Sequence, residues 1–335
     1  MNDPLAQVAE RLALGRITAP ARALEGGLLH RAWRVETSSG AYVFKQLNRA
    51  IAAKRGALAR TRACEGFAAD LASHRVPAIA ALAPKGDPIL LQDGVHWMVF
   101  PWVEGTTLAA GSIRIAHATT IGEALLAIHR LGRPAAGLGE LEQPFVTDAE
   151  WTSLTRASGA AGTQWTAALA GARGELRVAG TRAEAAFAGF REPVLASHRD
   201  LDPTNVVWRP DGSPALLDWE AAGAIHPSLE LVRAVFDWSA NADGTLERAR
   251  FVALVEGYRS HGGVLGEGAA PLVDAALGAM LPWLAYNLRR SLAEGDAASD
   301  ERRRADDAAR ESLSRLRVLV AGRNEWVSWL RKAQV

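Results

Sequence analysis

Residues 198–205 read His-Arg-Asp-Leu-Asp-Pro-Thr-Asn, and Leu-Asp-Trp-Glu follows at residues 217–220. The first stretch has the spacing of a phosphoryl-transfer catalytic loop, in which His-Arg-Asp is followed by four residues and then Asn. An acidic surface loop with a chance Asn is the alternative and would suffice for His-x-Asp alone, whereas the full spacing, followed by an apolar hairpin and a second Asp, is far more specific. Phosphoryl transfer needs a carboxylate beside the attacking hydroxyl and hard oxygen ligands for magnesium. We therefore expect Asp200 to be the general base, Asn205 and Asp218 to bind Mg²⁺, and ATP to be the donor.

The chain upstream of this motif predicts a small sheet-containing lobe. Period-two alternation and turn residues indicate five antiparallel strands, at residues 22–27, 32–37, 41–47, 87–92 and 96–103. Ser38-Ser39-Gly40 suits a hairpin turn, because glycine tolerates positive φ. Residues 54–74 repeat apolar side chains at helical spacing, so one helix accompanies the strands.

The rest of the chain predicts a larger, mainly helical lobe. Helical patterns lie near residues 115–130, 148–170, 180–190, 228–240, 245–260 and 270–293. The exception is residues 194–221, where short apolar runs and a Pro210-Asp211-Gly212 turn indicate a hairpin beside the motif. We expect an α+β, bilobal protein-kinase-like fold. Residues 1–103 would form the nucleotide-binding lobe, and residues 104–335 the helical lobe with the catalytic loop and substrate pocket.

Lys45 is the candidate phosphate-binding cation. It lies on the third predicted strand with apolar neighbours, ahead of the helix and upstream of the catalytic loop. On that helix, Glu65 adjoins the apolar stripe and could face inward to pair with Lys45. The alternatives are that Glu65 is an ordinary solvated glutamate, or that Asp70, whose direction suits the pair less well, is the partner. Gly26 and Gly27 lie between the first two strands and could let backbone N–H groups approach phosphates, although a plain turn explains them equally.

Residues 98–103, Met-Val-Phe-Pro-Trp-Val, lead from the fifth strand into the helical lobe. An adenine ring needs apolar faces and backbone hydrogen bonds, and such a connection provides both. A glycine-rich P-loop that ends in lysine is absent from the sequence, which excludes the commonest other way of binding ATP.

The composition is typical of a globular protein and argues against several kinds of partner and site. The 335 residues are 49% hydrophobic and 22% charged with a formal net charge of +1, which disfavours bulk attraction to nucleic acid or to an anionic membrane. Cys64 is the single cysteine, so disulfides within the chain and multi-cysteine metal sites are excluded. We expect a cytoplasmic protein, since no signal sequence or apolar run of membrane-spanning length is evident. The oligomeric state stays open.

With these residues in hand, the chain resembles the aminoglycoside phosphotransferase and choline kinase-like family over roughly residues 20–290. The resemblance implies the catalytic role for Asp200, magnesium binding by Asn205 and Asp218, and a Lys45–Glu65 pair that orients phosphates. It also implies an adenine site, with backbone contacts from Pro101 and Val103 and a pocket lined by Phe100, Val207 and Leu217. His129 falls where many members carry a structural Leu-His pair.

Three features depart from the usual pattern of that family. Arg199 precedes the catalytic Asp where a small or neutral residue is common, which makes the motif look like that of a protein kinase. Glu230 stands where an Asp is expected. The two glycines of the nucleotide loop are adjacent rather than spaced. These departures leave every catalytic group in place.

Three functions follow from these residues. The first is a kinase for a hydroxyl of a small molecule, such as an antibiotic (with a role in resistance), a sugar, an amino alcohol or a related metabolite. Candidate walls of its acceptor pocket are Trp151, Trp165, Trp238, Trp283, Tyr286 and Asn287. The second is a catalytically inactive nucleotide-binding module, and the third, disfavoured by Trp219-Glu220 after Asp218, is a protein kinase.

Overall fold

The structure is a computed structural model and describes residues 3–24, 30–143, 145–292 and 300–334. The chain divides into two compact units, which are described separately. Unit 1 comprises Met1–Leu108, Leu131–Glu140 and Ala196–Ala224, and unit 2 comprises Ala109–Arg130, Leu141–Leu195 and Ile225–Val335. Unit 1 therefore contains both the predicted nucleotide-binding lobe and the predicted catalytic loop.

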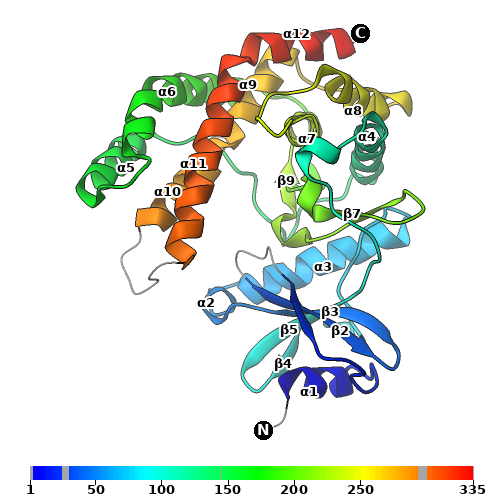
Figure 1. Ribbon diagram of the computed structural model, residues 1–335. Helices are drawn as coiled ribbons and strands as arrows, with labels where there is room; N and C mark the ends of the chain where they lie inside the picture. The colour runs from blue at the N-terminus through cyan, green and yellow to red at the C-terminus, as the bar shows by residue number, and fades with distance from the viewer. Residues whose placement is uncertain (1–2, 25–29, 144, 293–299, 335) are drawn as a thin grey trace. The chain divides into compact units, whose positions relative to one another are not determined.

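The main feature of unit 1 is a five-stranded antiparallel sheet with the strand order β1-β2-β3-β5-β4 (Figure 1). Its strands are β1 (Arg22–Leu24), β2 (Arg31–Thr37), β3 (Gly40–Gln46), β4 (Leu90–Gln92) and β5 (Val95–Pro101). The predicted sheet is thus confirmed. The hairpin between β2 and β3 turns where Thr37 pairs with Gly40, whose φ of 142° suits glycine.

Helices cover the two faces of this sheet. On one face, Val8 of α1 (Pro4–Arg11) packs with Phe44 and Val99 in one buried cluster. On the other, Leu58 of α3 (Ala57–Ser73) packs against a cluster containing Met98. A short helix not anticipated from the sequence, α2 (Arg49–Ala52), precedes α3.

The remainder of unit 1 carries the motif residues. Its elements are β6 (Leu195–Ser197), η2 (Pro203–Asn205), β7 (Val206–Trp208), β8 (Pro214–Leu216), η3 (Trp219–Ala221) and β9 (Gly223–Ile225), of which only the end residues Leu195 and Ile225 are assigned to unit 2. β7 and β8 form the predicted hairpin, with Val207 opposite Ala215, and β6 pairs with β9. Gly212 closes the hairpin turn with a φ of 82°.

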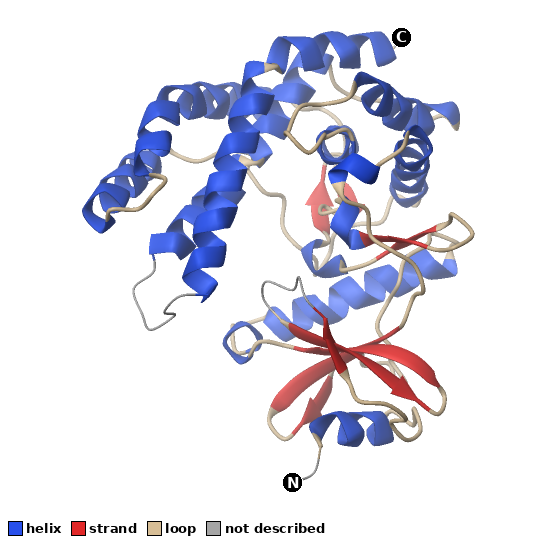
Figure 2. Cartoon of the chain, viewed as in Figure 1, coloured by secondary structure: helices blue, strands red, loops and turns tan. Residues whose placement is uncertain are grey.

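Unit 2 is built of helices (Figure 2). They are α4 (Ile115–Arg130), α5 (Asp148–Ala161), α6 (Thr166–Ala188), α7 (Pro227–Trp238), α8 (Arg248–Ser260), α9 (Ala269–Ala279), α10 (Leu281–Leu292), α11 (Asp300–Ala321) and α12 (Arg323–Ala333). One buried cluster joins Trp151 of α5, Trp165 at the N-cap of α6, Leu176 of α6, Leu284 of α10 and Leu316 of α11.

The boundary between α5 and α6 differs from the expected one. The sequence pattern indicated a break near residues 171–179, but α6 runs unbroken through Gly171 and Gly174. The break lies instead at Gly162, which ends α5 in a left-handed conformation with φ 62°. Burial of one face of α6 outweighs the weak helix propensity of its two glycines.

The last thirty residues, whose docking partner the sequence left open, pack within unit 2. Leu313 and Leu316 of α11 are buried in the same cluster as Trp165. Arg323 at the start of α12 binds Asp274 of α9 through two contacts of 2.5 Å. These contacts give the C-terminal helices a structural role within the chain.

Residues Ala269–Leu292, spanning α9 and α10, are long and apolar enough to cross a membrane by length and composition. The sequence pattern predicted a helix near residues 270–293, but the expectation that no apolar run reaches membrane-spanning length does not hold for this stretch. Of its 18-residue window, 61% is buried, which is also the pattern of a core helix in a globular protein.

Candidate active site

The catalytic-loop motif lies in a turn that local hydrogen bonds hold in one conformation. His198 is fully buried, its Nε2 donates to the Leu217 carbonyl at 2.9 Å, and its Nδ1 accepts from the Asp200 N–H at 3.3 Å. This arrangement fixes the imidazole tautomer and ties the loop to the segment that carries Asp218. Asp202 caps η2 by accepting from the Thr204 N–H at 2.7 Å.

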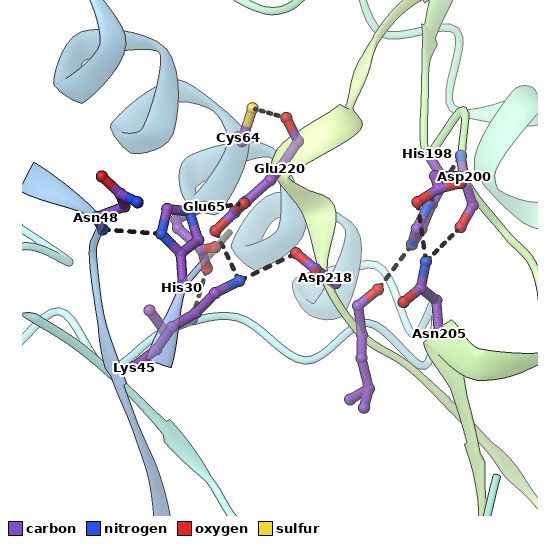
Figure 3. A network of polar contacts seen from close by, with 12 residues as sticks. His30, Lys45, Asn48, Cys64, Glu65, His198, Asp200, Asn205, Asp218 and Glu220 are labelled. Carbon is purple, nitrogen blue, oxygen red and sulfur yellow. Dashed lines mark hydrogen bonds and ion pairs between the residues drawn. The ribbon is translucent and has the colours of Figure 1, made fainter. Parts of the chain in front are cut away.

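Asp200 and Asn205, which flank the predicted catalytic loop, are in direct contact (Figure 3). The Asn205 Nδ2 donates to the Asp200 carbonyl at 2.8 Å and to its Oδ2 at 3.1 Å. The Asn205 carbonyl also accepts from the Leu217 N–H at 2.8 Å. This hydrogen bond brings the backbone of Asp218, the residue after Leu217, close to Asn205. One amide and two carboxylates thus come from adjacent backbone segments.

These residues fit a magnesium ion by their chemistry. In the described part of the chain, the Asn205 Oδ1 accepts no hydrogen bond, and Asp218 presents a carboxylate with 47% side-chain exposure. Oxygen ligands of this kind suit Mg²⁺, which keeps water and phosphate oxygens as its other ligands. A cluster of three or more acidic, His or Cys side chains able to hold a metal is absent from the described residues.

Lys45 lies beside this segment and is held by two carboxylates. Its Nζ is 3.2 Å from the Asp218 Oδ1 and 2.6 Å from the Glu220 Oε1. Burial by itself lowers the pKa of Lys45, but the charges of Asp218 and Glu220 outweigh burial and hold the pKa above its usual range. The ammonium is therefore fixed and charged at neutral pH.

Glu65 does not form the expected ion pair with Lys45. Its side chain is 3% exposed on α3, and its Oε2 accepts from the Ala81 N–H at 2.7 Å. Desolvation by burial raises the pKa of Glu65 to about 7, since the Ala81 hydrogen bond and the charge of Lys45 offset it only in part. The shape of the Ala81 segment, which the sequence pattern did not predict, gives Glu65 a different partner.

Two residues of this network were not assigned a role from the sequence. Glu220 ion-pairs with Lys45, and its Oε2 lies 3.2 Å from the Nε2 of His30. Burial alone would raise the pKa of Glu220, but the His30 hydrogen bond and the charge of Lys45 lower it to about 2. The sequence did contain a signal for Glu220, because it is an acidic residue only two positions after Asp218. A buried lysine such as Lys45 requires a negatively charged partner, and Glu220 could have been considered for that role.

The predicted adenine contacts lie around the end of β5. Pro101 and Val103 line an open groove of about 510 Å³, whose other walls are Ile79, Trp102, Glu104, Arg209, Pro210 and Asp211. The Val103 N–H and C=O make no hydrogen bond within the described chain, so both are available to a ligand.

The predicted base-pocket side chains lie outside that groove. Phe100 packs with Met98, and Met98 is the residue opposite Lys45 on β3. Val207 is half-buried on β7, and Leu217 joins the catalytic loop through His198. Gly26 and Gly27 lie outside the described residues.

The candidate acceptor walls in unit 2 separate into two groups. Trp151, Trp165 and Trp238 are at most 1% exposed and belong to the core, as does the fully buried Asn287. Trp283 and Tyr286 on α10 are 47% and 36% exposed, and their rings stack at 5.4 Å. Only the second group is open to a ligand.

His129 has the structural role that the resemblance implied. Its Nε2 is 2.7 Å from the Glu230 Oε2 and its Nδ1 is 2.9 Å from the Tyr258 hydroxyl, all buried within unit 2. Glu230 thus reaches the buried imidazole although it replaces the expected Asp. This departure from the family pattern affects the packing of unit 2.

Comparisons with solved structures agree with this fold. Spectinomycin phosphotransferase, solved with ADP and spectinomycin, is 12% identical with a TM-score of 0.67, over 95% of this chain and 98% of that chain. A choline/ethanolamine kinase family protein from Mesorhizobium loti is 19% identical with a TM-score of 0.61, over 98% and 100%. A microcompartment-associated aminopropanol kinase is 15% identical with a TM-score of 0.62, over 98% of both chains.

Proteins with curated descriptions include no detectable sequence relative. The model of the phosphotransferase enzyme family, in contrast, matches residues 20–264. This match covers the sheet, the catalytic loop and the segment that carries Asp218. The chain therefore belongs to the phosphotransferase enzyme family.

Proposed function

We propose that this protein is an ATP- and magnesium-dependent kinase that phosphorylates a hydroxyl group of a small molecule. The observation that supports it most is the contact network within unit 1. There, Asp200, Asn205, Asp218 and Lys45 lie on connected segments held by His198. Each member of the network has a side chain suited to one task of phosphoryl transfer.

In the proposed reaction, the acceptor hydroxyl oxygen attacks the γ-phosphorus while the bond to the β–γ bridging oxygen breaks and ADP leaves. Asp200 accepts the hydroxyl proton, with its Oδ2 oriented by the Asn205 amide. Asn205 and Asp218 would hold Mg²⁺, which supplies positive charge to the phosphates. Lys45 contributes a fixed cation, and the free Val103 peptide groups suit the adenine edge.

The acceptor is proposed to be an antibiotic, sugar, amino alcohol or related metabolite. Similar folds include proteins named for spectinomycin, choline or ethanolamine, and aminopropanol. Each of these acceptors carries a hydroxyl. A protein substrate is disfavoured because only residues 219–226 separate Asp218 from α7, and most of them belong to η3 and β9. Little chain remains for a peptide-binding activation segment.

The test is a phosphorylation screen. The native protein would be incubated with MgATP and pooled aminoglycosides, other antibiotics, amino alcohols and sugars, and mass spectrometry would detect a compound that gains one phosphoryl group. We expect Asp200→Asn to lower the rate by roughly 10²–10⁴-fold, the typical contribution of a positioned base. Binding of Mg·AMP-PNP should change little. Asp243→Asn, in an exposed turn of unit 2, is the matched control.

Transfer at the native rate by Asp200→Asn would refute the assignment of the base. Nucleotide binding by the native protein without any phosphorylated product would favour the inactive nucleotide-binding module instead. That alternative lacks support from the residues, since all four of Asp200, Asn205, Asp218 and Lys45 are present.

A further inference from the structure

Lys45 is held by a carboxylate that comes from the catalytic segment and not from helix α3. The Glu220 Oε1 is its nearest acidic partner at 2.6 Å, compared with 3.2 Å for the Asp218 Oδ1. Glu65, the buried acidic residue of α3, accepts from the Ala81 N–H instead. The role of orienting the lysine is therefore filled by a residue two positions after Asp218.

Glu220 is in turn held by a histidine whose proton position follows from its contacts. The Asn48 N–H donates to the His30 Nδ1 at 3.0 Å, so that nitrogen carries no proton. The neutral imidazole must then carry its proton on Nε2, which lies 3.2 Å from the Glu220 Oε2. The two oxygens of Glu220 are thus divided between Lys45 and His30 (Figure 3).

The support for His30 continues into the backbone. Asn48 is the N-cap of α2, and its side chain accepts from the Ala50 N–H at 2.9 Å. The side chains of His30 and Lys45 are 7% and 15% exposed and that of Glu220 is 28% exposed, so both contacts are partly shielded from water. A continuous chain of contacts therefore runs from the cap of α2 through His30 and Glu220 to Lys45.

We propose that Glu220 and His30 are positioning residues for Lys45, with Glu220 rather than Glu65 orienting the ammonium toward the phosphates. This inference rests on the proposed kinase function. Because Glu220 and Asp218 belong to one short segment, that segment would place the phosphate-binding cation and a proposed magnesium ligand together. His30 would act through Glu220 by holding the carboxylate in its orientation.

The chain offers a direct readout, since it contains only four lysines. Lysine labelled with ¹³C at Cε gives one signal for each, and Lys45→Arg identifies that of Lys45. We expect Glu220→Gln and His30→Ala to shift the Lys45 signal. His30→Gln, whose amide can replace the Nε2 donor, should return it toward the native position. Unchanged signals from the other lysines would show that the fold is intact.

Kinetics provide a second readout once the screen has supplied an acceptor. Glu220→Gln and His30→Ala should each lower kcat about tenfold, as expected for loss of one charge-assisted contact, with less than about a threefold change in the KM for MgATP. His30→Ala should add little in the Glu220→Gln background, because the two residues act through one contact. His96→Gln on β5, whose imidazole makes no hydrogen bond or ion pair within the described chain, is the matched control.

The inference is wrong if Glu65→Gln displaces the Lys45 signal more than Glu220→Gln does. It is equally wrong if His30→Gln behaves like His30→Ala. These outcomes differ from failure of the proposed function, in which the native protein transfers no phosphoryl group while the Lys45 signal still reports its contacts.

Discussion

Replacing Glu65 by Gln should change how the stability of this protein depends on pH. Burial raises the pKa of Glu65 in the folded protein to about 7, from 4.5 when the group is in water. Between these values the folded chain binds more protons at this site than the unfolded chain. Stability is therefore lost as the pH rises from 4.5 through 7, and the loss is complete above 7. At about 1.4 kcal/mol per pKa unit, this shift corresponds to at most about 3.5 kcal/mol.

Gln at position 65 does not titrate, and its side-chain oxygen can still accept from the Ala81 N–H. The free energy of unfolding of Glu65→Gln relative to native should thus increase between pH 5 and pH 8.5, by up to about 3 kcal/mol. Urea unfolding followed by tryptophan fluorescence measures it. Glu65→Asp, which still titrates, is the matched comparison. A difference between native and Glu65→Gln that stays constant with pH would refute the reasoning.

Three further changes test other parts of the structure. Gly105→Ala would place a Cβ 2.2 Å from the Trp208 carbonyl oxygen at a φ of 150°, so it should lower the free energy of unfolding by about 2–3 kcal/mol, measured by thermal unfolding. Gly86→Ala, where the added Cβ meets open space, should lower it by only about 1 kcal/mol, and equal losses would contradict the close approach at Gly105. Asp218→Asn should raise the Mg²⁺ concentration needed for half-maximal transfer by at least about tenfold, and an unchanged Mg²⁺ titration would remove Asp218 from the ligand set. The buried guanidinium of Arg250 donates to four backbone carbonyls, those of Ala110, Ile113, Ser239 and Ala240. A lysine cannot replace these contacts, so Arg250→Lys should lower the free energy of unfolding in urea by about 3 kcal/mol, and a loss below about 1 kcal/mol would contradict this.

The parts of the fold that were predictable depend on short-range signals. The hairpin turn at Gly40 and the strand pairing of β2 with β3 follow from alternation and a glycine with positive φ. The contact between Asp200 and Asn205 is also local, because η2 brings residues five positions apart together. Such features need no knowledge of distant parts of the chain.

The choice of partner for Lys45 was not predictable in this way. Helical periodicity placed Glu65 on the inward face of α3, and it is indeed buried there. Which polar group meets it depends on the irregular segment around Ala81, where no periodic pattern exists. Glu220 likewise reaches Lys45 only because η3 follows the left-handed turn at Asp218, where φ is 56°. Long-range pairing of charges thus requires the folded backbone.

Arg199 illustrates how a motif residue can depend on packing elsewhere. In the sequence it made the catalytic loop look like that of a protein kinase. In the structure it is 6% exposed, and its Nη1 donates to the Glu140 carbonyl at 2.8 Å. A Cβ on Gly139 or Gly223 would lie 2.7 or 2.4 Å from that nitrogen, so two glycines make room for the guanidinium.

Those two glycines belong to backbone segments that bond to each other. The Ala224 N–H donates to the Gly139 carbonyl at 2.7 Å, and the Gly139 N–H donates to the Ala222 carbonyl at 3.0 Å. Arg199 therefore packs the loop that carries Asp200 against β9, the strand that follows Glu220. Its presence reflects how unit 1 is packed, and it carries no information about whether the acceptor is a protein or a small molecule. The residues that bear on that question are the few between Asp218 and α7, where a short 3₁₀ turn and β9 occupy the chain.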